Sequence, residues 1–255
     1  MTVRFIGYVM VVAAVLSLEP RPVAGQTPAP LPRTADGRPD LSGVWQAVNT
    51  AAWNLEAHQA SKDVPAGLGV VDGGEIPYQP WAEAKRDENF ADRATADPEG
   101  KCHLPGVPRA TYMPYPFQIL QNAGHVAIVY EYAHTVRRIF MDTPHPRGPI
   151  SWYMGDSRGH WEGDTLVVDV IYFTDLTWLD RAGNFHSDAL HVVERYTPRG
   201  PDHIDYEATI EDPSVFTRPW TIRMPLYRRL DENVRILEYE CYTFDFEQTW
   251  QRPPL

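Results

Sequence analysis

The second half of the chain alternates hydrophobic and polar residues with the two-residue period of a β-strand. This pattern predicts strands at residues 117–121, 126–140, 165–173, 190–196, 203–211, 220–229 and 234–246. Runs rich in Gly, Pro, Asn and Asp separate several of them, as at residues 122–124 and 231–233. Strands that follow one another through such tight turns favour an antiparallel meander.

A closed barrel is the simplest way for a meander of this length to leave no free sheet edge. The triplet Gly43-Val44-Trp45 resembles the Gly-x-Trp at the start of lipocalin-type barrels, where the Trp closes one end. We therefore predict an all-β fold with an antiparallel, lipocalin-like barrel over residues 117–255. A β-sandwich is the alternative. A Rossmann or TIM arrangement is disfavoured because the strands do not alternate with long helices.

Residues 41–116 lack this alternation and are expected to form an N-terminal arm of coil and short helix, in one domain with the barrel. Modest helical character extends over residues 51–62, and a short helix with a charged face is predicted at residues 81–93. Glycines and prolines make residues 64–80 a loop and residues 97–116 a long ordered coil.

The start of the chain, residues 1–25, has the pattern of a secretory signal peptide, with an apolar run over residues 6–18 and small residues at the end. A membrane helix is the competing interpretation, but the run is short for a span and Glu19 ends it. A Pro-rich extended linker over residues 26–40 is expected to follow. The mature protein is therefore expected to be secreted or periplasmic, without membrane insertion.

The net charge of −11 argues against nucleic acid or an anionic membrane as a partner, although an acidic surface also serves solubility. The chain contains two cysteines, Cys102 and Cys241. In an oxidising compartment they would form a disulfide that ties the arm to a late strand. Two buried, unpaired thiols are the alternative.

Several longer stretches resemble a family of secreted bacterial proteins that has no assigned function. The most specific stretch is residues 159–169, Gly-His-Trp-Glu-Gly-Asp-Thr-Leu-Val-Val-Asp, and shorter ones lie at residues 36–45 and 105–109. The resemblance covers nearly all of the chain after the signal peptide. It implies export and a shared fold, and it carries no activity across.

The sequence lacks a P-loop, a Gly-x-Gly-x-x-Gly, a His-Glu-x-x-His and a Cys-x-x-Cys motif, so we expect no cofactor. Residues 155–159 do match Gly-x-Ser-x-Gly, which in α/β-hydrolases holds a nucleophilic Ser between a strand and a helix. In this chain a turn and then a strand follow the motif. We therefore interpret it as a glycine-rich loop.

Strand parity places a polar set inside the predicted barrel, because residues two apart share a face. The set comprises His134, Arg138, Asp169, Glu194 and Glu238, with Tyr130 and Tyr132 beside them. In our hypothesis His134 is a general acid or base, and Asp169 or Glu194 orients it. Arg138 would stabilise negative charge on a substrate. The alternative is an Arg–carboxylate network that only fixes strand register.

A second polar group is expected on loops at one rim of the barrel, and it comprises His160, Glu162, Asp164, Asp180 and His186. A metal site made of His160, His186 and a carboxylate is geometrically conceivable, but no metal is predicted because Gly163 and Asp164 are typical of a hairpin turn. The candidate ligand contacts are Tyr130, Tyr132, Glu238, His160, His186 and Trp178.

Together these features predict an exported β-barrel that holds a small, mostly apolar or aromatic organic molecule. One hypothesis is a cofactor-independent acid–base enzyme, such as an isomerase, dehydratase or hydratase. The alternatives are a ligand carrier without turnover and an envelope interaction module. The sequence does not indicate the oligomeric state.

Overall fold

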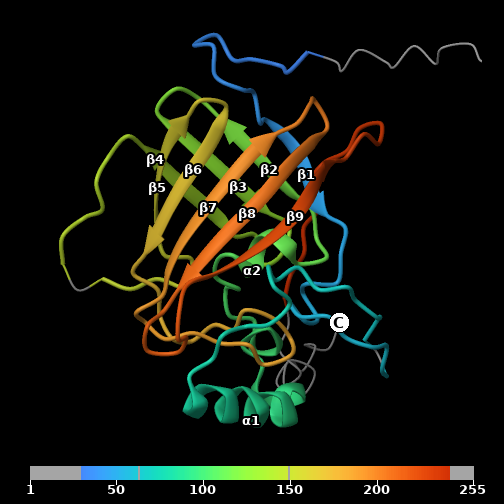
Figure 1. Ribbon diagram of the computed structural model, residues 1–255. Helices are drawn as coiled ribbons and strands as arrows, with labels where there is room; N and C mark the ends of the chain where they lie inside the picture. The colour runs from blue at the N-terminus through green and yellow to red at the C-terminus, as the bar shows by residue number, and fades with distance from the viewer. Residues whose placement is uncertain (1–29, 63, 149, 242–255) are drawn as a thin grey trace, which may run out of the picture.

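The computed structural model describes residues 30–62, 64–148 and 150–241. Within these residues nine strands close a barrel in the order of the chain (Figure 1). The strands are β1 (Gly43–Ala47), β2 (Phe117–Gln121), β3 (His125–Tyr130), β4 (Val136–Met141), β5 (Asp156–Glu162), β6 (Thr165–Ile171), β7 (His191–Pro198), β8 (His203–Glu211) and β9 (Trp220–Arg228). The predicted signal peptide lies outside the described residues.

The barrel is closed because β1 pairs with both β2 and β9, which rules out the sandwich. Neighbouring strands pair antiparallel except for β4 and β5, which run parallel through three residue pairs from Ile139–Ser157 to Met141–Gly159. The predicted barrel is therefore confirmed, and it departs from a simple meander at this junction. A parallel pair needs a connection that returns along the strand, and its described residues, 142–148 and 150–155, form neither a helix nor a named strand.

The two-residue pattern located the later strands well: β2 and β8 have the predicted bounds. The predicted strand 126–140 is instead divided into β3 and β4 by a tight turn, in which Ala133 and His134 have positive φ angles of 52° and 49°. No strand forms in residues 234–241, the described part of the last predicted strand, where Tyr239 makes one bridge to Tyr132.

Two strands were not predicted, since the residues of β1 were assigned to the arm and those of β5 to a glycine-rich loop. In β1, Trp45 is buried, and its indole N–H donates to the Leu41 carbonyl at 2.8 Å. The Arg228 guanidinium lies 4.3 Å from the centre of the Trp45 ring. Gly43, at a φ of 137°, leaves the space through which this guanidinium passes to the Ser42 carbonyl. These contacts lock β1 to β9.

Side chains fill the inside of the barrel. Along β7 and β8 every second residue is buried, and the inward positions of the other strands are mostly aliphatic or aromatic. Barrels of about this size are either filled by side chains or hold one small ligand. The predicted ligand site inside the barrel stays a prediction, and the pockets described below open at the surface.

The arm supplies helices at one end of the barrel. These are α1 (Pro80–Ala96), close to the helix predicted at residues 81–93, a 3-10 turn η1 (Pro98–Lys101) and α2 (Arg109–Tyr112). The helical character predicted for residues 51–62 is wrong. That segment forms turns because Asn49 accepts from the Ala51 N–H and His58 pairs with Gly67, which folds the chain back.

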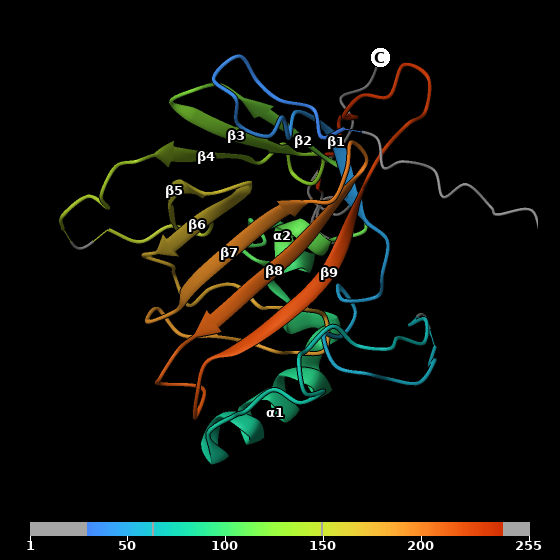
Figure 2. The same ribbon diagram turned by 45° about the horizontal axis from the view of Figure 1, so that its top comes forward.

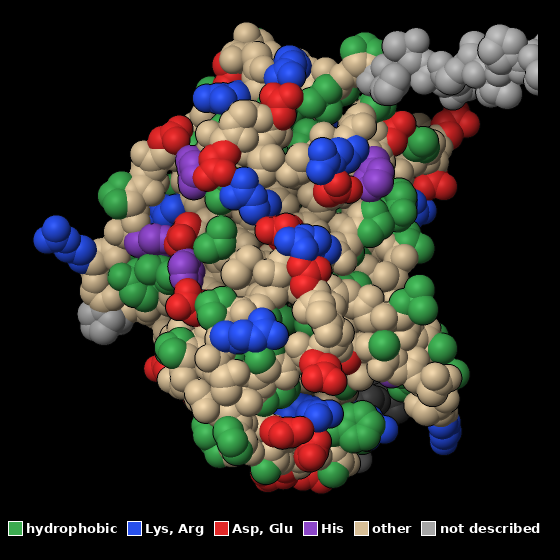
Figure 3. Space-filling model, viewed as in Figure 1, with side chains coloured by type: hydrophobic (Ala, Val, Ile, Leu, Met, Phe, Trp, Pro, Cys, Tyr) green, Lys and Arg blue, Asp and Glu red, His purple; other side chains and the backbone are tan. Residues whose placement is uncertain are grey.

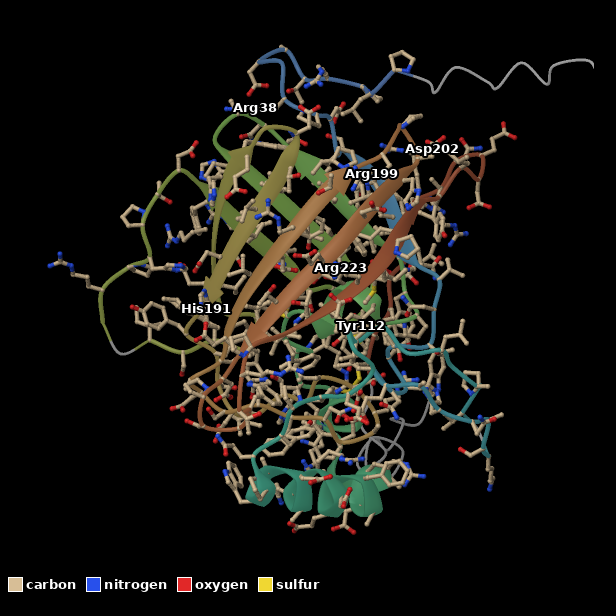
Figure 4. All side chains as sticks on the ribbon, in the orientation of Figure 1. Arg38, Tyr112, His191, Arg199, Asp202 and Arg223 are labelled. Carbon is tan, nitrogen blue, oxygen red and sulfur yellow. A yellow bond between two sulfur atoms is a disulfide. The ribbon has the colours of Figure 1, made fainter. Side chains whose placement is uncertain are left out.

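Helix α2 lies at the lower mouth of the barrel in Figure 1, and α1 lies below it in both ribbon views (Figures 1 and 2). The α2 residues are all buried, and the Tyr112 hydroxyl donates to the Leu179 carbonyl at 2.7 Å (Figure 4). Arg109 of α2 pairs with Asp97 and Glu99, so the helix is held by charge as well as by packing. Helix α2 thus plugs this end of the barrel.

Cys102 and Cys241 form a disulfide across 139 residues of sequence, which resolves the two alternatives in favour of the bridge. The expectation of a late strand at its second end was wrong, because Cys241 follows coil rather than a strand.

Among the described residues, none of the helices combines the length and the apolar character needed to cross a bilayer.

Candidate functional site

A polar cluster lies inside the barrel around Glu194 of β7, whose exposed fraction is 0%. The Arg137 guanidinium from β4 donates to Glu194 Oε2 and, through Nε, to Ser157 Oγ of β5 at 2.9 Å. Glu194 Oε1 accepts from the hydroxyls of Tyr196 at 3.0 Å and Tyr206 at 2.8 Å. Four strands thus converge on one ion pair.

Burial sets the protonation of this cluster. It raises the pKa values of Tyr196 and Tyr206 well above the ordinary value, so both hydroxyls stay protonated and act as donors. Burial alone would lower the pKa of Arg137, but the Glu194 carboxylate outweighs it and the net shift is upward. The Arg137 guanidinium and the Glu194 carboxylate are therefore both charged, their net charge is zero, and further hydrogen bonds hold the pair in place.

Three polar atoms in this region have no hydrogen-bond partner among the described residues. They are Nη1 of Arg137, the hydroxyl of Tyr130 and the hydroxyl of Thr111 in α2. Each belongs to a residue that is 2% exposed or less. Buried polar groups are normally paired, and these three groups lie close enough to one another for the Tyr130 hydroxyl to interact with Thr111 and Arg137.

A pocket of about 460 Å³ opens through the wall of the barrel next to this cluster. It arises because β5 pairs only with the last residues of β4, which leaves Val136 to Arg138 without a neighbour on that side. We call it the seam pocket, and its walls include Leu104, Val136, Arg137, Phe140, Trp152 and Ser157. Two of its apolar residues are unusually exposed, Val136 at 58% and Trp152 at 38%.

Of the residues predicted to lie inside the barrel, the structure places Glu194 and Tyr130 there. His134 lies instead in the turn after β3, where its side chain is 44% exposed and 3.7 Å from Glu240. The alternation that would place His134 inside the barrel ends at the turn formed by Ala133 and His134, so that β4 turns the other set of alternate residues inward. Arg137 consequently points inward, and Arg138 lies on the outer face, at the mouth of the seam pocket.

Two further interior predictions were wrong or incomplete. Glu238 is exposed, in a segment that is coil rather than strand. Tyr132 is buried as predicted, but it lies beyond the end of β3, where its ring packs on Tyr115 and Tyr239. Its hydroxyl donates to the Glu99 carbonyl at 3.2 Å. Tyr132 therefore helps to join the arm to the barrel.

Asp169 faces outward from β6 and joins a chain of polar contacts on the surface. Its carboxylate lies 2.8 Å from His145 Nε2 and 3.0 Å from His191 Nε2, and His145 Nδ1 lies 2.7 Å from Asp156. Figure 3 shows imidazoles beside carboxylates on this face, and Figure 4 places His191 near the lower end of β7. Because His145 belongs to the β4–β5 loop, the contacts fasten this loop to the sheet.

The contacts of Asp169 predict a modest dependence of stability on pH. The hydrogen bond with His191 lowers the pKa of Asp169 and raises that of His191. The stability that Asp169 contributes is present above its pKa in the unfolded chain and is lost as the pH falls through its pKa in the folded protein. The stability that His191 contributes is present below its pKa in the unfolded chain and is lost as the pH rises through its pKa in the folded protein. Their joint effect is therefore largest between about pH 4 and pH 6.5.

We expect Asp169→Asn to lower the free energy of unfolding by about 1 kcal/mol or less in that range, because the site is half-exposed. The loss should shrink as the pH rises through the raised pKa of His191 in the folded protein, because the imidazole then loses its charge in the folded state as well. Urea unfolding across the pH range measures it, with Asp188→Asn as control, an exposed carboxylate without an ion pair in the described residues. Equal profiles for the two variants would contradict the prediction.

The residues predicted at one rim do not form a single group. His160 lies 3.1 Å from Glu162 on the exposed surface, and Asp164 pairs with Arg33. His186 is buried, within 2.7 Å of Thr177 Oγ1, and burial lowers its pKa. Asp180 is fully inaccessible, and burial raises its pKa to about 6. In the described part of the chain, no three His, Cys, Asp or Glu side chains are arranged to hold a metal ion.

Trp178 is mostly buried beside Phe185, in the loop that contains His186, and neither residue lines the seam pocket. The residues that do build the interior cluster were only partly foreseen. Tyr196 shares the predicted face of Glu194, whereas Ser157 was interpreted as part of a loop. The contact between Ser157 and Arg137 could be predicted only if the pairing of β4 with β5 was known.

The fold and the site define a closed barrel with a buried ion pair in its core and a side pocket at the seam between β4 and β5. Comparisons of the chain with protein-family models, curated proteins and solved structures find no match. The functional argument therefore depends on the site itself.

Proposed function

We propose that this is an exported binding protein that holds a small organic molecule in the seam pocket. The observation that carries the proposal is the seam pocket itself, which has the exposed apolar side chains of Val136 and Trp152 in its wall and the buried Arg137–Glu194 pair beside it. A carbonyl oxygen of a ligand that reached Arg137 would accept a hydrogen bond from its guanidinium. The flexible Met154 in the wall would allow the local adjustment that admits it.

The charge of the cluster favours a neutral ligand. Glu194 already balances Arg137, so an anionic group beside them would be a buried charge without compensation. Arg138 at the mouth is exposed to solvent, where its charge is screened. Aromatic and aliphatic side chains, among them Phe140, Trp152 and Tyr153, would contact the body of the molecule. Ketones, esters, lactones and amides belong to the ligand class that we propose.

Binding is better supported than acid–base turnover. His134 is not among the residues that line the seam pocket, and Asp169 is engaged with His145 and His191 on the outside. Glu194 accepts three hydrogen bonds from Arg137, Tyr196 and Tyr206, which leaves it a structural anchor. The Cys102–Cys241 bridge supports export, because disulfides persist in oxidising compartments.

A matched pair of probes tests this proposal: acetophenone, a neutral ketone, and benzoate, a carboxylate of the same size. Ligand-observed NMR should detect acetophenone binding to the wild-type protein, and the part of the binding that Trp152→Ala removes should be larger for acetophenone than for benzoate. Trp152→Ala should weaken acetophenone binding about tenfold, because it removes an aromatic wall of the pocket.

Leu120→Ala is the control, since Leu120 is an exposed apolar residue of β2 that does not line the pocket. It should leave the dissociation constant unchanged. Failure of acetophenone and of a wider set of neutral carbonyl compounds to bind would overturn the proposal. So would an equal effect of the two alanine variants.

A further inference from the structure

A second cleft, of about 610 Å³, lies within the arm, between its coil near Trp53 and Lys62 and its helix α1. Its walls come from the arm near Trp53 and Lys62, from the C-terminal half of α1 at Phe90 and Arg93, and from the loop at Arg181. We call it the arm cleft. It shares no lining residue with the seam pocket among the described residues, so it is a separate site.

Two arginine–aromatic pairs line the arm cleft. The Arg93 guanidinium lies 4.1 Å from the centre of the Phe90 ring, and that of Arg181 lies 5.0 Å from the Trp53 ring. Phe90 is 45% exposed, which is unusual for a large aromatic side chain. The cleft thus combines aromatic faces with cationic groups that can form forked hydrogen bonds.

Both guanidinium groups are held in place before any ligand binds. Arg93 Nη1 donates to the Phe90 carbonyl at 2.6 Å. Arg181 uses Nε and Nη2 to bind the Glu99 carboxylate at 2.9 and 2.6 Å. Arg93 Nη2 and Arg181 Nη1 make no hydrogen bond within the described ranges. Groups that are already ordered lose little entropy when they bind a ligand.

The charge balance of the arm cleft opposes that of the whole chain, whose net charge is −11. Asp97 lines the cleft, but it is paired with Arg109. Glu99 is shared by Arg109 and Arg181, so these two arginines balance the two carboxylates. Among the described side chains of the wall, the charge of Arg93 is left in excess, and Lys62 adds a further cation. A local positive site on an acidic protein selects anions.

We propose that the arm cleft binds a planar aromatic carboxylate, with its ring against Trp53 or Phe90 and its carboxylate at Arg93. The aromatic walls supply stacking and the burial of apolar surface. The N–H groups of Arg93 that have no partner among the described residues supply a charge-assisted hydrogen bond to the carboxylate. A neutral ligand would use only the first of these contributions, so the arm cleft and the seam pocket differ in the charge that they prefer.

The probe is 2-naphthoate, compared with the neutral 2-acetylnaphthalene, on the full chain. In the Trp152→Ala variant, in which the seam pocket is weakened, ligand-observed NMR titration should give a dissociation constant for 2-naphthoate at least about tenfold lower than for the ketone. Arg93→Gln should remove most of that preference and weaken 2-naphthoate about tenfold. Binding should also weaken as salt rises from about 0.05 to 0.5 M, because the cleft is open and its charges are screened.

Arg199→Gln is the matched control, since it removes the same charge at the end of the barrel opposite α1 (Figure 4). It should leave 2-naphthoate binding unchanged. Phe90→Leu keeps the charge and should weaken both probes a few-fold. The proposal is overturned if 2-naphthoate does not bind or if the two arginine variants behave alike. Loss of 2-naphthoate binding in Trp152→Ala would also overturn it, since it would place the probe in the seam pocket.

Discussion

Glu194→Leu is expected to lower the free energy of unfolding by about 3–5 kcal/mol, because it leaves a buried arginine charge without compensation. Arg137 is 2% exposed, and Glu194 is its carboxylate partner. The hydroxyls of Tyr196 and Tyr206 lose their acceptor in the same step. Equilibrium unfolding in urea measures the loss as a lower transition midpoint.

A double variant separates the ion pair from the packing around it. Arg137→Met alone should lower the free energy of unfolding by a similar amount, since it leaves the Glu194 carboxylate buried without its cationic partner. In Arg137→Met/Glu194→Leu both charges are gone, so the combined loss should be smaller than the sum of the single losses by about 2 kcal/mol. Strictly additive losses would mean that the two side chains do not depend on each other.

Arg138→Met is the control for the same experiment, because the next residue of β4 faces solvent. Its effect should stay within about 0.5 kcal/mol. The comparison also tests the assignment of the inward face. A loss at Arg138 as large as that at Arg137 would mean that the inward-facing arginine has been misassigned.

The difference between Arg137 and Arg138 shows where sequence reasoning works in this chain and where it stops. Alternation within one strand is a local property, and it placed Glu194 and Tyr130 on the inner face of the barrel correctly. It did not carry through Ala133 and His134, because two successive residues with positive φ change the parity of everything that follows. Neither residue type signals such a turn as strongly as glycine or Asn-Gly would.

The candidate site depends on contacts between strands that are distant in sequence. Ser157 meets Arg137 because β5 lies beside β4 in parallel, and a pattern of hydrophobic residues does not encode which strands become neighbours. The same pairing creates the seam pocket. Sequence reasoning therefore reached the barrel and one half of its buried ion pair, whereas the pocket follows from topology.

Removal of the Cys102–Cys241 bridge is expected to have the second large effect, a loss of about 2–5 kcal/mol in the free energy of unfolding. The bridge joins the arm to coil that follows the last strand, and it closes 139 residues of chain. A cross-link over so long a loop restricts the unfolded chain strongly in the chain-entropy account, which places the effect near the upper end of this range.

Cys102→Ser/Cys241→Ser should therefore unfold at a lower urea concentration than the wild type, and the reduced wild type should match it. Reductant should leave the double variant unchanged, which separates reduction from other effects of the reagent. The bridge also fastens the arm near Tyr132 and Glu99, so its loss should increase hydrogen exchange in η1 before it affects β7 and β8. Uniform exchange across arm and barrel would instead mean that the two unfold as one unit.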